Sequence, residues 1–143
     1  MLASRAVDAE TLLDRARAAR EHAYAPYSDF AVGAALLAED GRVFTGANVE
    51  NRSFGLSLCA ERAAVAAAVA AGSRRFRAIA VVTATSPPAA PCGLCRETLA
   101  EFCGPELAIH LAGLDGGRRD FRLGELFPEP FVFPREAPAP GRR

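Results

Sequence analysis

Residues 57–66, "LSLCAERAAV", contain the feature on which the fold prediction rests. From here to residue 71 alanine and valine dominate, which is typical of a helix packed in a protein interior. Yet this helix would begin with Cys59, Glu61 and Arg62 within four positions. Because charged groups are costly to bury without partners, we expect these three side chains to act together at the start of the helix.

A second junction of loop and helix has the same character. The sequence "PCGLC", residues 91–95, stands at the start of a helix predicted from Cys92 to about Cys103. Unpaired backbone N–H groups and the positive end of the helix dipole favour thiolate over thiol in the first turn. Cys92 and Cys95 lie on one helical face, and Cys59 can join them if the two helix starts meet. The pattern predicts a metal site with three cysteine ligands.

The other cysteine and the two histidines are poor candidates for a fourth ligand. Cys103 lies eight residues beyond Cys95, about 12 Å further along the same helix. His22 and His110 are expected to have structural roles, at a helix end and within an apolar strand. Three protein ligands with an open fourth position are typical of catalytic zinc.

Glu61 and Arg62 fit such a centre. In the first helical turn, the Glu61 carboxylate could reach the open position and move protons. Three thiolates on one zinc ion carry a net negative charge, which Arg62 would offset by hydrogen bonding to the cysteine sulfurs. The alternative is that both are ordinary solvated residues of a first helical turn.

The composition restricts the class of protein. With 143 residues, half of them hydrophobic, one domain is expected over residues 1–133, followed by a flexible proline- and arginine-rich tail, 134–143. Seventeen acidic and 17 basic residues cancel, which argues against a nucleic-acid polymer as partner. The longest apolar helical stretch, 63–71, is too short for a membrane span and is expected to be a buried helix. No secretion signal is evident, and four cysteines suit a metal or redox site inside the cell, so we expect a cytoplasmic protein.

Hydrophobic periodicity and turn residues predict helices and strands in the order α-β-β-α-β-α-β-β. Asp40-Gly41 is a hairpin signal, and Gly72 is expected to end the second helix. This order predicts an α/β fold with one mixed sheet covered by helices. The predicted helices are 8–22, 59–72, 92–103 and a short turn at 124–127; the predicted strands are 31–38, 42–48, 76–83, 107–112 and a weaker one at 120–123.

Cys59-Ala60-Glu61-Arg62 followed by Pro91-Cys92-Gly93-Leu94-Cys95-Arg96 resembles the cytidine deaminase family. The segments "YAPYSDFAVGAALL", "GANVENRSFG" and "GELFPEPF" extend the resemblance over about residues 8–133. It implies a three-layer α-β-α sandwich with a mixed five-stranded sheet. It also implies one Zn²⁺ per subunit on Cys59, Cys92 and Cys95, with Glu61 as proton shuttle.

The resemblance further implies a binding site for a pyrimidine nucleoside. Phe30 would pack near the base, Asn48 and Glu50 would bond the ribose 3′ region, and the backbone at Ala60 would contact the pyrimidine edge. In having three cysteine ligands the chain resembles the small homotetrameric branch of the family. This resemblance implies that Phe131 would complete the pocket of a neighbouring subunit. The implied reaction is hydrolytic deamination at C4 of cytidine or deoxycytidine, giving uridine or deoxyuridine and ammonia, in pyrimidine salvage without an organic cofactor.

Four positions depart from the family pattern and leave open a modified or unusual aminopyrimidine nucleoside as substrate. Phe54 stands where tyrosine is usual, which removes a hydroxyl but keeps the stacking face. Leu94 could crowd the metal loop, Glu97 adds a charge, and Ala90 replaces a common serine. The pattern Asn48-Val49-Glu50, which blasticidin deaminases lack, favours a ribose-bearing substrate.

Three other functions fit parts of the sequence. The sequence "PCGLC" also resembles a thiol–disulfide exchange site, which would leave Cys59 and Glu61 unexplained. A structural zinc module would need a fourth protein ligand. A polynucleotide deaminase would need a basic groove, and the only dense basic cluster is "SRRFR", residues 73–77.

Overall fold

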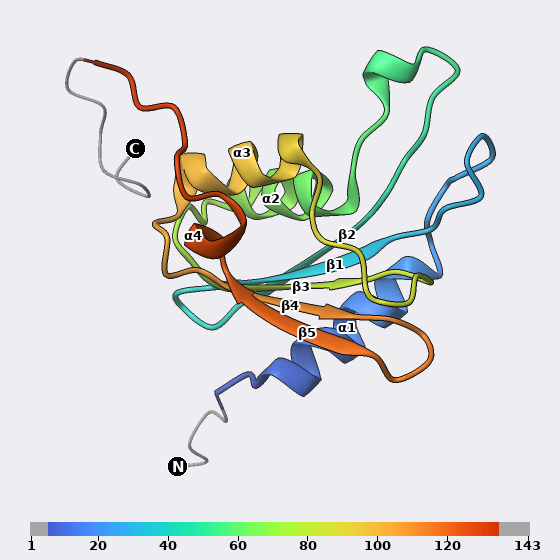
Figure 1. Cartoon of the computed structure of the whole chain (residues 1–143), viewed down its shortest axis with the longest axis horizontal. Helices are drawn as coiled ribbons and strands as arrows, with labels where there is room; N and C mark the ends of the chain where they lie inside the picture. Colours follow the sequence, from blue (N-terminus) through green and yellow to red (C-terminus); the bar gives the residue numbers. More distant parts are fainter. Residues whose placement is uncertain (1–5, 135–143) are drawn as a thin grey trace.

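A computed structural model describes residues 6–134, and in it a five-stranded sheet lies between helices (Figure 1). Apart from Pro134, the predicted tail lies outside the described residues. The elements are α1 (Ala9–Arg20), β1 (Gly33–Ala38), β2 (Val43–Ala47), the 3₁₀ turn η1 (Phe54–Leu56), α2 (Ala60–Ala70), β3 (Phe76–Val82), α3 (Gly93–Phe102), β4 (Ala108–Ala112), β5 (Arg118–Arg122) and α4 (Leu123–Leu126).

The strand order is β2-β1-β3-β4-β5, which confirms the predicted mixed sheet. β1 pairs antiparallel with both β2 and β3, β3 pairs parallel with β4, and β4 pairs antiparallel with β5. The turn between β1 and β2 lies at Asp40-Gly41, where Gly41 has φ +93°. Glycine reaches this left-handed conformation without steric cost, as the hairpin prediction required.

The two faces of the sheet are covered by different helices, so the three-layer architecture is also confirmed. Leu12, Leu13 and Ala16 of α1 pack on one face, while α2 and α3 cover the other (Figure 1). Every residue of β1 is buried, and so are the last five of β3. Central strands covered on both faces bury alternate side chains on both sides, which explains their continuous apolar sequence.

The prediction that α2 is a buried helix is wrong for its outer face. Its inner face, with Ala64, Val65 and Ala68, is buried against the sheet, whereas Ala66 and Ala67 are exposed. Alanine allows a helix to lie close to a sheet on one side without requiring cover on the other. No helix within residues 6–134 is long and apolar enough to span a membrane.

The edge strand β5 differs in its bounds from the weaker strand predicted at 120–123. It begins at Arg118, and its exposed arginines and Asp120 lie beside the partly buried Phe121. An edge strand needs few apolar residues, so hydrophobicity alone places its start too late. α4 follows at once and begins at Leu123.

The start of α2 is held against β2 by a close contact at Gly46. A Cβ at this position would lie 2.4 Å from the carbonyl oxygen of Ala60 and 2.5 Å from the amide nitrogen of Ala64. Backbone therefore packs directly on backbone. This contact fixes the height of α2 above the sheet, and with it the position of the residues at the helix start.

We expect Gly46→Ala to lower the free energy of unfolding by about 1–3 kcal/mol or more, because the added methyl group must displace backbone atoms of α2. Denaturant unfolding would measure it. Gly93→Ala is the matched control: a Cβ at Gly93 meets no heavy atom within 4 Å, and alanine favours the helix by about 0.5–1 kcal/mol. Equal stability of the two variants would contradict the close-packing account.

Candidate active site

Two helix N-termini meet above the sheet and bring three cysteines together. Cys59 is the N-cap residue of α2 and Cys92 is the N-cap residue of α3, while Cys95 lies in the first turn of α3. The predicted helices begin at Cys59 and Cys92. In the structure each of these cysteines lies one residue before the first helical residue, in extended conformation. An N-cap side chain still faces the unpaired N–H groups of the first turn, so the predicted electrostatics are retained.

The distances between the sulfurs fit a zinc ion. Cys59 Sγ lies 3.7 Å from Cys92 Sγ, Cys92 Sγ lies 3.5 Å from Cys95 Sγ, and all three sulfurs lie within 4.8 Å of one another. Tetrahedral zinc with bonds of about 2.3 Å would hold its sulfurs about 3.8 Å apart. None of the three forms a disulfide. Thiolate donors at this spacing match the preference of Zn²⁺.

Within residues 6–134, no further cysteine, histidine or carboxylate joins this group. Cys103 lies in the hydrophobic core, where burial raises the pKa of its thiol to about 12. His110 Nδ1 lies 2.6 Å from Asp120 Oδ1 on the neighbouring strand β5. Both residues thus have the structural surroundings expected from the sequence, and the sulfur cluster keeps one side without a protein donor.

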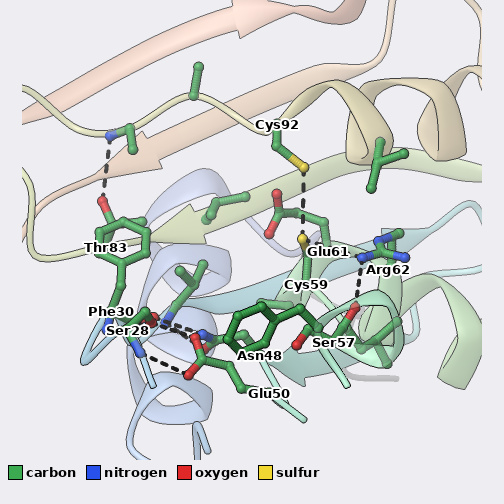
Figure 2. Close-up of a pocket in the computed structure, with 18 of the residues that line it drawn as sticks. Ser28, Phe30, Asn48, Glu50, Ser57, Cys59, Glu61, Arg62, Thr83 and Cys92 are labelled. Carbon is green, nitrogen blue, oxygen red and sulfur yellow. Dashed lines mark hydrogen bonds between the residues drawn. The ribbon is translucent and has the colours of Figure 1, made fainter. Parts of the chain in front are cut away.

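Arg62 is bonded to the sulfur cluster. Its Nη2 donates to the carbonyl oxygen of Ser57 at 3.1 Å and to Cys59 Sγ at 3.6 Å (Figure 2). Hydrogen bonds from Cys95 and Arg62 lower the pKa of Cys59 to about 5. The hydrogen bond with Cys59, together with burial, raises the pKa of Cys95.

Glu61 is buried, with 5% of its surface exposed. Figure 2 shows its carboxylate beside the Cys59–Cys92 pair, on the opposite side from Arg62. Burial raises its pKa above the usual range for a glutamate. A carboxyl group in such an environment gains and gives up protons more readily near neutral pH than an exposed one.

These groups form one end of a cavity of about 520 Å³, large enough for a small organic molecule. Nine of the predicted site residues line it: Phe30, Asn48, Glu50, Phe54, Cys59, Ala60, Glu61, Arg62 and Cys92. Cys95 is fully buried and does not line it. The cavity thus joins the sulfur cluster to the segment 28–32 and to the loop after β2.

Phe131 does not line this cavity. The residue is 73% exposed, and the segment after α4 leaves the fold at the end opposite to η1 (Figure 1). Its ring packs edge-to-face with that of Phe133, with centroids 6.0 Å apart. Within one chain, therefore, the structure does not bring Phe131 to the other predicted site residues.

Asn48 and Glu50 follow β2 and are held by hydrogen bonds. Asn48 Oδ1 accepts from the Val32 N–H at 2.8 Å, and its Nδ2 donates to the Phe30 carbonyl at 2.7 Å. Glu50 Oε1 accepts from the N–H groups of Tyr27 at 2.9 Å and Ser28 at 3.1 Å, and Oε2 accepts from the Ser28 hydroxyl. These hydrogen bonds hold the pKa of Glu50 below its usual range, and the bond from the Ser28 hydroxyl contributes most.

Three of the four departures from the family pattern, Phe54, Ala90 and Leu94, line the cavity. Phe54 is 73% exposed, and its ring packs edge-to-face with that of Tyr27. Leu94 lines the cavity and is 65% exposed. Ala90 also lines the cavity, and Glu97 is exposed on α3.

Ser28 and Thr83 line the cavity without having been singled out from the sequence. Thr83, at the end of β3, is buried, and its hydroxyl lies 3.0 Å from that of Thr85. A lone serine or threonine in a loop has no distinctive spacing, so only the position of Ser28 within "YAPYSDF" could have indicated it. The folded chain brings both residues next to groups far away in sequence.

Comparisons with known proteins agree with this geometry. The sequence model described as "Cytidine and deoxycytidylate deaminase zinc-binding region" matches residues 6–111. The cytidine deaminase of Sporosarcina psychrophila is 46% identical over 125 residues, which cover 87% of this chain and 92% of that protein. The cytidine deaminase of Mycobacterium tuberculosis is 49% identical over 125 residues, covering 87% and 90%.

Solved structures share the whole fold. A crystal structure of cytidine deaminase from Burkholderia pseudomallei superposes with a TM-score of 0.84 at 51% identity, over 87% of this chain and 99% of that one. The Mycobacterium tuberculosis enzyme superposes with a TM-score of 0.78 at 47% identity, over 89% and 99%. With its five-stranded sheet and its cluster of three cysteines, the chain belongs to the cytidine deaminase family.

Proposed function

We propose that this chain is a zinc-dependent hydrolase that deaminates cytidine or deoxycytidine at C4, giving uridine or deoxyuridine and ammonia. The observation that carries the proposal is the convergence of three free cysteine sulfurs beside the buried Glu61 at one end of a nucleoside-sized cavity. Relatives that are named cytidine deaminases and match over nearly the whole fold support the reaction. A thiol–disulfide exchange site would require neither the third sulfur nor Glu61.

Cys59, Cys92 and Cys95 would hold the zinc ion, and their donor set and spacing fit it. Zinc in such a site acts as a Lewis acid that makes water nucleophilic at neutral pH. Glu61 would take one proton from this water and pass it to N3 of the pyrimidine, and would then take the remaining proton of the hydroxyl added at C4 and pass it to the amine, which leaves as ammonia. Arg62 keeps Cys59 charged and oriented through its hydrogen bond to the sulfur.

Phe30, Asn48, Glu50 and the backbone at Ala60 would orient the nucleoside. The hydrogen bonds already made leave one N–H on Asn48 Nδ2 and one acceptor site on Glu50 Oε2. A sugar hydroxyl can accept from the first and donate to the second. This complementarity supports a ribose or deoxyribose group near the cavity mouth, with the base reaching inward toward Glu61.

A modified aminopyrimidine nucleoside is the second candidate, because Phe54, Leu94 and Ala90 all line the cavity and differ from the usual residues. Ammonia release from cytidine, deoxycytidine, free cytosine, a base-modified nucleoside and blasticidin would rank the substrates. Activity limited to blasticidin or the modified nucleoside would contradict the first proposal.

We propose that the protein works in the cytoplasm, in pyrimidine salvage.

We also propose a homotetramer in which Phe131 of one subunit completes the pocket of another. Phe131, Val132 and Phe133 are each more than 60% exposed in the single chain, as are Phe54 and Leu56 of the η1 turn. Exposed apolar groups in two separate places are typical of surfaces that associate. The C-terminal segment of one chain covering the cavity mouth of another would bury both.

Glu61→Gln should lower kcat at least about hundredfold, because the amide cannot take up and release a proton. It should leave the zinc content and the melting temperature unchanged or nearly so, since the side chains have the same shape. Steady-state kinetics and zinc analysis on the same preparation would measure both. Loss of zinc together with activity would show that Glu61 acts through the metal site instead.

Zinc analysis of cysteine variants would test the ligand set. The unchanged protein should contain one zinc ion per chain, while Cys92→Ala should contain much less, because two sulfurs bind zinc far more weakly than three. Cys103→Ala is the matched control, because this cysteine lies in the core away from the cluster. It should lose some stability but retain its zinc. Equal zinc loss in both variants would contradict the assignment.

Mixed oligomers would test the shared pocket. Glu61→Gln and Phe131→Ala subunits should each show weak activity alone. Mixed tetramers, purified by two different tags after co-expression, should regain activity, because some pockets then combine an intact Glu61 with a neighbour's intact Phe131. No recovery in a verified mixture, or a monomer in sedimentation at micromolar concentration, would contradict the sharing.

A further inference from the structure

One serine hydroxyl links Glu50 to the turn that carries Phe30. Ser28 Oγ donates to Glu50 Oε2 and accepts from the backbone N–H of Phe30 at 3.0 Å. The carbonyl of the same Phe30 accepts from Asn48 Nδ2 at 2.7 Å. Figure 2 shows Ser28, Phe30, Asn48 and Glu50 gathered on one side of the cavity, away from the sulfurs. A continuous chain of hydrogen bonds thus runs from Glu50 through Ser28 and Phe30 to Asn48.

The direction of each bond in this chain is determined by its partners. The Phe30 N–H can only donate, so Ser28 Oγ accepts from it. The Glu50 carboxylate can only accept, so the Ser28 hydroxyl proton points to Oε2. The pKa of Glu50 lies below its usual range, with this hydroxyl as the leading cause, which keeps the carboxylate charged. The hydroxyl therefore has one orientation, and so does the carboxylate.

The turn that carries Ser28 is held in an uncommon conformation. Asp29, between Ser28 and Phe30, has φ +56°, in the left-handed region that non-glycine residues seldom occupy and aspartate occupies more often than most. This conformation directs the Phe30 N–H back to Ser28 Oγ while the Phe30 side chain lines the cavity. The hydroxyl bond stabilises the turn, so the positions of the Phe30 ring and of Glu50 depend on one another.

We infer that Ser28 is a positioning residue for the nucleoside sugar: its hydroxyl aims the remaining acceptor site of Glu50 at the ribose 3′-hydroxyl and ties that carboxylate to the turn bearing Phe30. The inference rests on the proposed function, because it takes the ligand to be a nucleoside. Among the described residues Ser28 hydrogen-bonds to Glu50 and to the Phe30 N–H and to none of the three cysteines, so its loss should affect sugar recognition rather than the chemical step.

A pair of substrates that differ only in the 3′-hydroxyl tests this role. With deoxycytidine, Ser28→Ala should lower kcat/KM about tenfold, mostly through KM, because a hydrogen bond to a charged group is lost. With 2′,3′-dideoxycytidine the same variant should lower kcat/KM no more than about threefold, because this substrate lacks the 3′-hydroxyl that would donate to Glu50. An equal loss for both substrates, a loss confined to kcat, or no loss at all would overturn the inference.

Matched variants separate this role from a general effect on folding. Ser28→Thr keeps a hydroxyl and should restore the preference for deoxycytidine over the dideoxy substrate. Ser53→Ala is the control, because Ser53 is exposed in the next loop, makes no side-chain cap bond and does not line the cavity. It should leave both substrates unchanged. If Ser28→Ala does not fold, Ser28→Cys, with its weak donor, should show the same selective loss.

Product binding separates failure of this inference from failure of the proposed function. In calorimetry with zinc-loaded protein, Ser28→Ala should bind deoxyuridine about tenfold more weakly than the unchanged protein, and 2′,3′-dideoxyuridine about equally well. If the protein without substitutions shows neither turnover nor binding of these nucleosides, the proposed function itself is refuted. Normal turnover with no selective loss in Ser28→Ala would refute only the role of Ser28.

Discussion

The meeting of two helix N-termini on one face of the sheet is the constraint on which the site depends. Cys59 and Cys92 are 33 residues apart in sequence, yet each is the N-cap residue of its helix, and their sulfurs lie 3.7 Å apart. Both helices must begin at the same height above the sheet for this to occur. Gly46 sets that height for α2 because it allows backbone contact between β2 and the helix.

The same meeting point gives the site its unusual electrostatics. Helix N-termini favour negative charge, which suits thiolate ligands of a metal ion. Arg62 then adds a positive group on one side of the sulfurs, and Glu61 remains buried on the other. One helical turn thus carries a metal ligand, a proton carrier and a charge partner, and Arg62 reaches the Cys59 sulfur because residues three apart lie on the same side of a helix.

The outer half of the cavity is built by different means. It consists of loop residues that have no regular secondary structure, and hydrogen bonds between segments 16 to 23 residues apart hold it together. Loops usually vary more than the elements they join, which suits a region that selects the substrate. The proposed chemistry thus lies at two helix starts, and the proposed recognition of the sugar lies at a hydrogen-bonded turn.

Much of the molecule could be predicted from the sequence by local rules. The order of helices and strands, the hairpin at Asp40-Gly41 and the mixed sheet follow from periodicity and turn chemistry, which act over a few residues. The cysteine spacing within α3 follows from helix geometry, and it also excluded Cys103. The resemblance to the family added the assignment of Phe30, Asn48 and Glu50, which no local pattern could supply.

Only the tertiary structure decided which side chains meet. The hydrogen bond of Ser28 with a carboxylate 22 positions away, the exposure of one face of α2, and the absence of Phe131 from the lining of its own cavity all depend on packing between separate segments. Local propensity contains no information about such contacts. Sequence by itself therefore determined the elements and the kind of chemistry, while the fold determined the geometry in which that chemistry can operate.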